Sequence, residues 1–193
     1  MIIQQAPIDG RNNLGNFLNQ KGLLREGVEV GTHRGKFARQ ILSQWKGQCL
    51  YCIDHWQTGW SSTDPTAFGD RSLDRAEAVK LLTPFKDRAR ILCMTSIEAS
   101  DLFSDKSLDF VYIDGNHHTT GFRSDVETWW PKLKPGGILA GHDVVCPYQE
   151  NSGWGYEIQP VLFRFCDYHN KILYLITEPL GRLRAHWSFY IER

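Results

Sequence analysis

Apolar positions along this chain follow two spacings, one typical of buried strands and one typical of helices. Short apolar runs predict strands at residues 27–31, 48–54, 90–94, 108–114 and 138–143. Apolar residues three or four positions apart predict helices at residues 37–45, 71–85, 97–103 and 122–133. Strands that alternate with helices in this way form a parallel sheet with helices on both faces. We therefore expect an α/β fold, a Rossmann-like three-layer sandwich.

Two segments depart from this alternation near the first half of the chain. Leu14, Phe17 and Leu18 form a weak apolar stripe, which predicts a leader helix within residues 1–24. The segment 55–70 is too long for an ordinary connection between a strand and a helix, so we interpret it as a lid-like insertion over a pocket. A small subdomain core is the alternative for its three large aromatic residues, Trp56, Trp60 and Phe68.

The last third of the chain predicts a helix followed by a hairpin. Pro160 is compatible with the first turn of that helix. Two apolar runs follow, at residues 172–178 and 187–191, with Pro179-Leu180-Gly181 at their junction. A junction this short indicates a hairpin, so we expect the last strand to be antiparallel to its neighbour.

Composition narrows the class of protein. The 193 residues are enough for one domain, which we expect to span residues 1–193. Lys plus Arg and Asp plus Glu number 22 each, so the net charge is zero and no basic excess points to nucleic acid or an anionic membrane. The chain shows neither a secretory signal pattern nor the roughly 18 apolar residues of a spanning helix. We expect a soluble, cytoplasmic protein.

The five cysteines do not form a pattern typical of a disulfide framework, since their number is odd and their spacing does not repeat. Cys49 and Cys52 have the spacing of a CxxC pair. They lie on a predicted strand, however, where alternation sends residues 49 and 52 to opposite faces. This favours buried structural thiols over a redox or zinc pair.

Polar residues follow the first two predicted strands at the edge where open α/β sheets bind ligands. Glu29-Val30-Gly31 leads into a turn that ends at Gly35, and glycines there let a ligand approach the backbone before a helix N-terminus. The GxGxxG spacing of dinucleotide-binding turns is absent, because His33 stands where the second glycine is needed. Asp54 ends the next strand, where a carboxylate accepts hydrogen bonds from ribose hydroxyls. A nucleoside site is the prediction, and a plain turn with a solvated acid is the alternative.

A second group of polar residues ends two later strands, which we expect to be neighbours in the sheet. Asp114 is followed by His117 and His118, and the pair His142-Asp143 ends the next strand. Carboxylates and imidazoles at an open edge suit a divalent cation. Helix capping by the two aspartates and surface positions for the histidines are the alternatives, and we favour the surface for His118. Five of the seven histidines follow strand ends, so we expect activity to depend on pH.

The region around Asp114 resembles a known family. The string Val111-Tyr112-Ile113-Asp114-Gly115-Asn116-His117, followed by Asp125, Trp129-Trp130, Pro135-Gly136-Gly137 and Gly141-His142-Asp143, is similar to the class I S-adenosylmethionine (SAM)-dependent methyltransferases. Within that class the chain resembles the small-molecule O-methyltransferases that include macrolide-sugar and cephalosporin-related enzymes. Residues 29–35 look like the first motif of the family and Asp54 like its second, so that the likeness covers about residues 25 to 145. The resemblance implies a seven-stranded sheet with an antiparallel last strand.

The resemblance also implies roles for individual residues. Gly31 and Gly35 would border the methionine part of SAM with Glu29 and Thr32 nearby, Asp54 would hold the ribose, and Thr95 and Ser96 would lie near the adenine. Asp114 would also contact the cofactor. Asp114, His142 and Asp143 match the positions that hold Mg²⁺ in metal-dependent members, although the imidazole of His142 leaves open which divalent cation binds. The expected catalytic residues are Asp114, His117 and His142: the cation would lower the pKa of a substrate hydroxyl, and His117 would take the proton.

The expected function is therefore O-methylation of a small-molecule acceptor, held by the aromatic residues of segment 55–70 and by the loop from Tyr148 to Tyr156. A nicotinamide-dependent oxidoreductase is one alternative, because Asp54 would equally serve the ribose of NAD. A non-catalytic nucleoside-binding module is another. N-methylation, the identity of the acceptor, and self-association through the leader helix or the terminal hairpin stay open.

Overall fold

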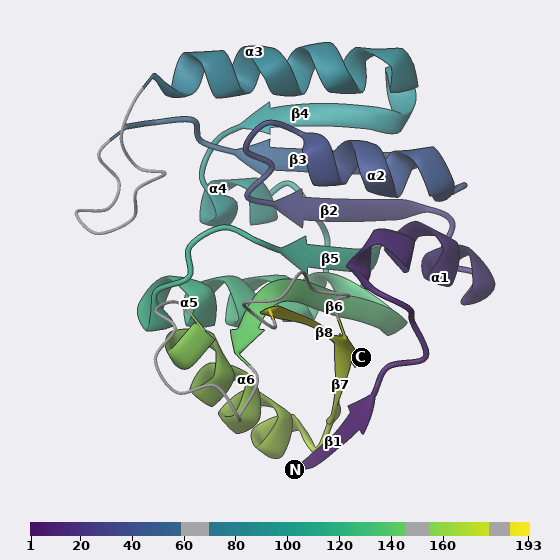
Figure 1. Cartoon of the computed structure of the whole chain (residues 1–193), viewed down its shortest axis with the longest axis vertical. Helices are drawn as coiled ribbons and strands as arrows, with labels where there is room; N and C mark the ends of the chain where they lie inside the picture. The colour runs from purple at the N-terminus through teal and green to yellow at the C-terminus, as the bar shows by residue number, and fades with distance from the viewer. Residues whose placement is uncertain (59–69, 146–154, 178–185) are drawn as a thin grey trace.

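The computed structural model describes residues 1–58, 70–145, 155–177 and 186–193, and these residues form one eight-stranded sheet (Figure 1). The strand order is β1-β7-β8-β6-β5-β2-β3-β4. Strand β8 is antiparallel to both β6 and β7, whereas the other neighbours are parallel, as the terminal hairpin and the family resemblance predict. The strand bounds are β1 Ile2–Gln5, β2 Glu26–Val30, β3 Cys49–Asp54, β4 Ala89–Cys93, β5 Leu108–Ile113, β6 Leu133–Val145, β7 Ile172–Thr177 and β8 His186–Glu192.

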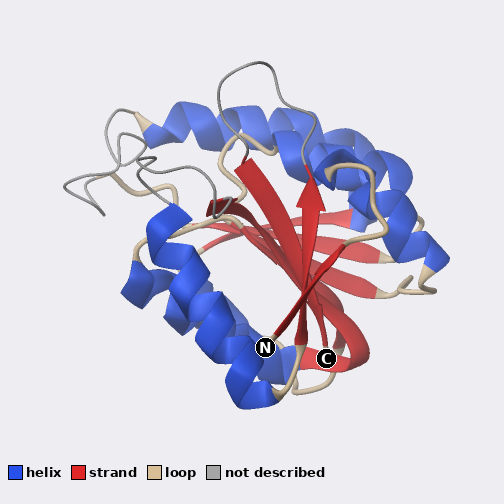
Figure 2. Cartoon of the chain, turned by 60° about the horizontal axis from the view of Figure 1, so that its bottom comes forward, coloured by secondary structure: helices blue, strands red, loops and turns tan. Residues whose placement is uncertain are grey.

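Helices cover both faces of this sheet (Figure 2). Those of one face, α4, α5 and α6, share a core with Val28, Val111 and Leu139. Those of the other face, α1 and α2 with the end of α3, share a second core with Phe110 and Tyr190. The bounds are α1 Leu14–Gln20, α2 Lys36–Gln44, α3 Arg71–Leu82, α4 Ser96–Ser100, α5 Thr119–Trp129 and α6 Gly155–His169, with 3-10 turns at Arg11–Asn13, Thr83–Arg88 and Trp130–Lys132. The expected three-layer α/β sandwich is confirmed.

Two expectations for the elements are wrong. The leader contains a strand as well as a helix, because β1 precedes α1 and pairs with β7, which makes eight strands rather than seven. The helix predicted to reach residue 133 ends at Trp129, and β6 begins at Leu133 rather than at residue 138. The Pro135-Gly136-Gly137 segment lies inside β6, and Gly136 has a positive φ of 76°. The register against β5 shifts there, so an irregular strand start replaces the predicted break.

Other features of the described residues agree with the sequence. Cys49 and Cys52 are free and buried, and burial raises the pKa of both thiols. Among the described helices, none has the length and apolar character needed to cross a membrane. Trp60 and Phe68, most of the loop from Tyr148 to Tyr156, and the hairpin junction Pro179-Leu180-Gly181 lie outside the described residues.

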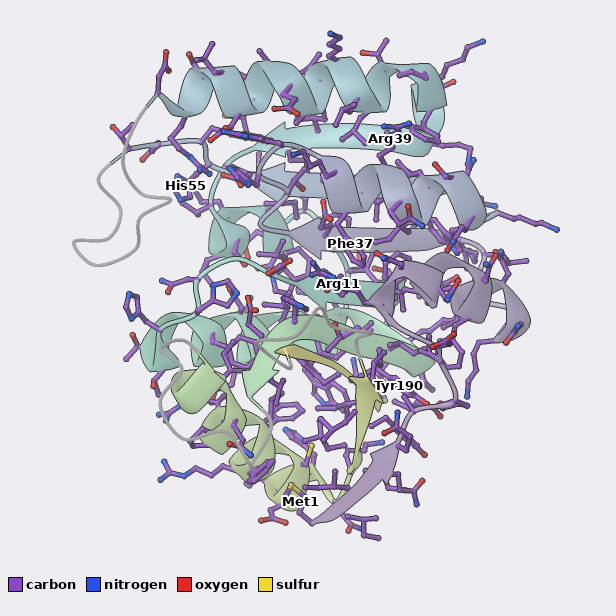
Figure 3. The ribbon with its side chains drawn as sticks, in the orientation of Figure 1. Met1, Arg11, Phe37, Arg39, His55 and Tyr190 are labelled. Atoms are coloured by element: carbon purple, nitrogen blue, oxygen red, sulfur yellow. The ribbon has the colours of Figure 1, made fainter. Side chains whose placement is uncertain are left out.

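Strands β2 to β6 run parallel to one another, so their carboxyl ends share one edge of the sheet. The arrowheads of β2, β3, β4 and β5 point to the left in Figure 1, and His55, which follows β3, lies on that side in Figure 3. The candidate ligands predicted after these strands therefore gather at one edge.

Candidate functional site

A cavity of about 650 Å³ opens at this edge, which is a typical size for a small-molecule site. It is lined by residues from the ends of β2, β3, β4, β5 and β6 and from α5. The predicted residues among them are Gly31, Asp54, Thr95, Ser96, Asp114, His117 and Asp143. Glu29, Thr32, Gly35 and His142, which were also predicted, do not line it.

The Gly31 turn brings three strand ends together. Its backbone N–H and that of Thr32 donate to the carbonyl of Ile53, at 2.8 and 3.1 Å. Gly31 has a φ of +88°, and a Cβ atom there would lie 2.1 Å from the carbonyl oxygen of Asp114. Only glycine tolerates both the backbone conformation and this close approach, so the turn requires the residue that the motif predicted.

Glu29 and Thr32 are buried behind this turn, 2% and 4% exposed. A hydrogen bond between the two side chains works to lower the pKa of the Glu29 carboxyl group. Burial raises the pKa of Glu29 to about 8, and the negative charges of Asp114 and Asp54 add to the effect. The carboxyl group is therefore mostly protonated at neutral pH, and the two buried polar groups lie behind the turn that borders the cavity.

Asp54 is held in place by the backbone around it. Its Oδ2 accepts from the N–H of His33 at 2.8 Å, and its Oδ1 accepts from the N–H of Trp56 at 2.9 Å. Trp56 is fixed in turn, since its indole N–H donates to the His33 carbonyl at 2.8 Å and its side chain is buried. Each carboxylate oxygen can accept two hydrogen bonds, so one acceptor position on each oxygen remains for a ligand.

A cationic network that the sequence did not predict lies beside Asp54. Arg71, the first residue of α3, is buried, and its guanidinium lies 3.8 Å from Asp54 Oδ2 and 3.0 Å from Asp74 Oδ2. Arg34 donates to the other oxygen of Asp74 at 2.6 Å, and His33 Nε2 lies 3.3 Å from Asp74 Oδ2. The network joins α3 to the turn after β2. A charged residue that starts a helix gives no sequence signal of such a role.

Thr95 and Ser96 lie at the start of α4, where they differ in exposure. Thr95 is exposed and forms a capping box with Glu98, so its hydroxyl serves the helix end. Ser96 is half-buried, and its Oγ accepts from the indole N–H of Trp129 at 2.9 Å. Ser96 thus presents a fixed hydroxyl to the cavity.

Asp114, His117 and Asp143 form an acidic cluster at the other side of the cavity. One potential ligand atom from each lies within 4.8 Å of the others. His117 Nε2 lies 3.4 Å from Asp114 Oδ1 and 3.1 Å from Asp143 Oδ2. Burial works against the charged imidazolium, but the contacts with both carboxylates outweigh it and raise the pKa of His117 to about 10. The pKa of Asp143 is lowered, because hydrogen bonds from His117 and His142 outweigh its burial.

A bulge in β6 positions Asp143. The pairing of β6 with β8 shifts register between Gly141 and Val144, and Asp143 has a positive φ of 62°. His142 lies next to the cluster rather than in it, with its Nδ1 2.8 Å from Asp143 Oδ1. The potential ligand atoms that lie together are those of Asp114, His117 and Asp143, whereas the predicted set was Asp114, His142 and Asp143, and His142 contacts this cluster through Asp143.

Arg11 brings a further cation to this cluster from the N-terminal segment. Its guanidinium lies 3.7 Å from Asp114 Oδ2 and within 3.5 Å of the Tyr112 hydroxyl. It also lies over the ring of Phe37, 5.2 Å from the centroid, and Figure 3 shows the two side chains close together. The leader thus contributes to the site through Arg11, which no motif in the sequence indicates.

A family model described as a methyltransferase domain matches residues 28–144, which is more than half of the chain. The chain belongs to the methyltransferase domain family. A methyltransferase domain agrees with the SAM-dependent methyltransferase that the sequence predicts. Among curated proteins, the methyltransferase domain is 28% identical over 120 residues to a protein of Sinorhizobium fredii described as uncharacterized protein y4gI. That match covers 60% of this chain but only 13% of the longer relative.

Solved structures share the fold of this methyltransferase domain at low sequence identity. Cofactor-bound Rv0187 from MTB has a TM-score of 0.69 at 13% identity, over 98% of this chain and 83% of that one. The O-methyltransferase from Bacillus cereus in complex with SAH has a TM-score of 0.68 at 13% identity, over 94% of this chain and 80% of that one. These similarities support the fold. The acceptor and any bound metal are argued below from the residues of the site.

Proposed function

We propose that this domain transfers the methyl group of SAM to a hydroxyl of a small-molecule acceptor, with a divalent cation bound at the acidic cluster. The observation that carries the proposal is that the cluster of Asp114, His117 and Asp143 lines the same cavity as Asp54 and Ser96. One cavity thus offers acceptors for a nucleoside and, beside them, a group of acids and an imidazole suited to activating a hydroxyl. The likeness to O-methyltransferases of the macrolide-sugar and cephalosporin-related branch supports the same reaction.

The residues of the cavity fit SAM along its length. The two free acceptor positions of Asp54 match the two ribose hydroxyls. Glu29 and Thr32 are buried behind the Gly31 turn, and Gly31 itself lines the cavity where the amino-acid end of SAM would lie. Ser96 lines the same cavity and follows β4, the neighbour of the strand that ends at Asp54. We assign the methionine end of SAM to the Gly31 turn and the adenine to Ser96.

The acidic cluster fits a divalent cation. We assign its oxygen ligands to Asp114 and Asp143, and His142 orients Asp143 through its 2.8 Å contact. Carboxylate ligands suit Mg²⁺ or Mn²⁺. When bound, the cation would polarise the acceptor hydroxyl and offset the negative charges that keep His117 protonated.

Catalysis then requires positioning and one proton transfer. The acceptor oxygen must lie in line with the methyl–sulfur bond, so that the new oxygen–carbon bond forms as the carbon–sulfur bond breaks and its electrons pass to sulfur. His117, between the two carboxylates, can take the proton that the hydroxyl loses only once its pKa has fallen from about 10 to near neutral. The donor end of the cavity fixes the sulfonium, and the cluster fixes the hydroxyl.

A methyl-transfer assay tests this proposal. The purified protein is incubated with SAM and a panel of hydroxyl, amine and RNA acceptors, with a chelator and with Mn²⁺ or Mg²⁺ added back. We expect SAH and a methyl ether from at least one small hydroxyl acceptor, loss of activity with the chelator, and recovery on adding the cation. Transfer that a chelator leaves unchanged contradicts the cation, and transfer only to amines or RNA contradicts the acceptor class.

A further inference from the structure

Asp125 is a buried acid in the cavity wall that the proposed reaction does not use. It lies on α5, is only 5% exposed, and lines the cavity together with Ser96 and Gly115. Burial raises its pKa to about 6, while a hydrogen bond with Ser96 and the charge of His117 work in the opposite direction. Burying an acid costs stability unless its carboxyl group is hydrogen-bonded or paired with a charge.

A chain of hydrogen bonds orients this carboxyl group. The Trp129 indole N–H donates to Ser96 Oγ at 2.9 Å, which leaves the hydroxyl hydrogen of Ser96 to donate to Asp125. Asp125 Oδ2 lies 3.9 Å from the position that a Cβ atom on Gly115 would occupy. The carboxyl group therefore lies between Ser96 and the space above Gly115, with acceptor capacity beyond its bond to Ser96.

The chemistry of SAM limits which of its groups can meet an acid at this place. Ribose hydroxyls match Asp54, and the amino-acid end matches the Gly31 turn. The polar groups of SAM that remain are those of adenine. Its exocyclic amine donates N–H hydrogen bonds, whereas its ring nitrogens accept them. A fixed carboxyl acceptor next to Ser96 is complementary to that amine.

We propose that Asp125 is a specificity-determining residue, which accepts a hydrogen bond from the exocyclic amine of the adenine of SAM and thereby selects adenine over a base with a carbonyl at that position. This inference rests on the proposed function. It differs from a purely structural role, in which Asp125 would only join α4 to α5 through Ser96 and would not distinguish one base from another.

The wild-type protein provides the first test. Its affinities for SAH and for S-inosylhomocysteine, in which a carbonyl replaces the amine, are measured by calorimetry. Loss of a hydrogen bond to a buried carboxyl group, with a carbonyl facing it instead, should weaken binding by about 100-fold. Equal affinity for the two ligands overturns the inference. Failure of the folded protein to bind SAH at all overturns the proposed function as well, so the two failures are distinguishable.

Substitutions test whether Asp125 is the residue responsible for the preference for SAH over S-inosylhomocysteine. In Asp125→Asn the amide can donate to the inosine carbonyl, so the preference for SAH should fall to within about tenfold. Ser96→Ala removes the orienting hydroxyl and should reduce the preference more weakly. Asp101→Asn removes an exposed carboxylate near α4 and should leave it unchanged. A preference that persists in folded Asp125→Asn contradicts the inference, and if that variant does not fold, the Ser96→Ala ratio decides.

Discussion

Asp54→Asn removes the charge and one acceptor oxygen of the predicted ribose ligand while keeping its shape. In the structure, the two carboxylate oxygens accept from the backbone N–H groups of His33 and Trp56, and one acceptor position on each stays available. An asparagine amide must turn its NH₂ group toward one of these backbone donors. It therefore loses one protein hydrogen bond and one of the two acceptor positions for ribose.

The size of the effect follows from these contacts. A hydrogen bond to a charged acceptor contributes about 1.5 to 3 kcal/mol, and a neutral one about 1 kcal/mol. Losing one charged bond to ribose and weakening the other should cost about 3 kcal/mol of cofactor binding, which is roughly a 100-fold increase in Kd. Unfolding of the ligand-free variant should also require less free energy, because buried Arg71 loses one of its two carboxylate neighbours.

Calorimetric titration with SAH measures the binding change, and thermal unfolding without ligand measures the change in stability. Asp70→Asn is the matched control: Asp70 is an exposed helix-capping carboxylate next to Arg71, and asparagine caps a helix equally well. We expect the control to bind SAH as the wild type does. A folded Asp54→Asn variant with a Kd within threefold of wild type refutes the assignment of ribose to Asp54.

Three further predictions concern the cluster and the turn. Asp143→Ala should weaken Mn²⁺ binding at least about 100-fold. His117→Ala should keep the Mn²⁺ affinity within about tenfold of wild type and lower kcat by about 10² to 10⁴. Equal losses of Mn²⁺ affinity in the two variants would make His117 a ligand instead of the base. The raised pKa of Glu29 means that its stabilising contribution is present below pH 4.5 and is lost as pH rises through about 8. The free energy of unfolding of ligand-free Glu29→Gln, measured with denaturant and compared with wild type, should therefore rise by about 3 kcal/mol between pH 5 and pH 8. A difference that does not depend on pH would contradict the raised pKa of Glu29. Gly31→Ala should lower the free energy of unfolding by more than about 2 kcal/mol, because the added Cβ meets the Asp114 backbone. The control Gly22→Ala, at a φ of +70° with open space around it, should lower it by only about 1 kcal/mol. Equal losses in the two variants would show that the structure relieves the close approach at Gly31.

The sequence predicted the core of the fold because buried strands leave a clear pattern. All six residues of β5 are buried, and a run of this length at 108–113 is typical of a strand buried on both faces. Strand β1 leaves no such pattern, since its four residues Ile2–Gln5 are all exposed and it pairs with β7 alone. The early start of β6 was missed because proline and two glycines normally end an element, whereas here they lie in an irregular strand.

The candidate site was predictable where it depends on position along the chain. Asp54 and Asp114 lie at strand ends, and parallel pairing brings strand ends to one edge. Which of two adjacent histidine and aspartate side chains enters the cluster depends on the bulge at Asp143, and a bulge cannot be read from alternation. Arg11 and Arg71 reach the site from a turn and a helix start, so only tertiary structure shows their contacts with Asp114 and Asp54.

Titration of the purified wild-type protein with SAM, and separately with NAD, tests the central claim most directly. Because Asp54 offers two ribose acceptors and the turn at Gly31 lacks the GxGxxG spacing for a dinucleotide, only SAM should bind. The account predicts saturable binding of SAM with a Kd in the micromolar range and no heat of binding with NAD. Saturable binding of NAD together with no binding of SAM would contradict it.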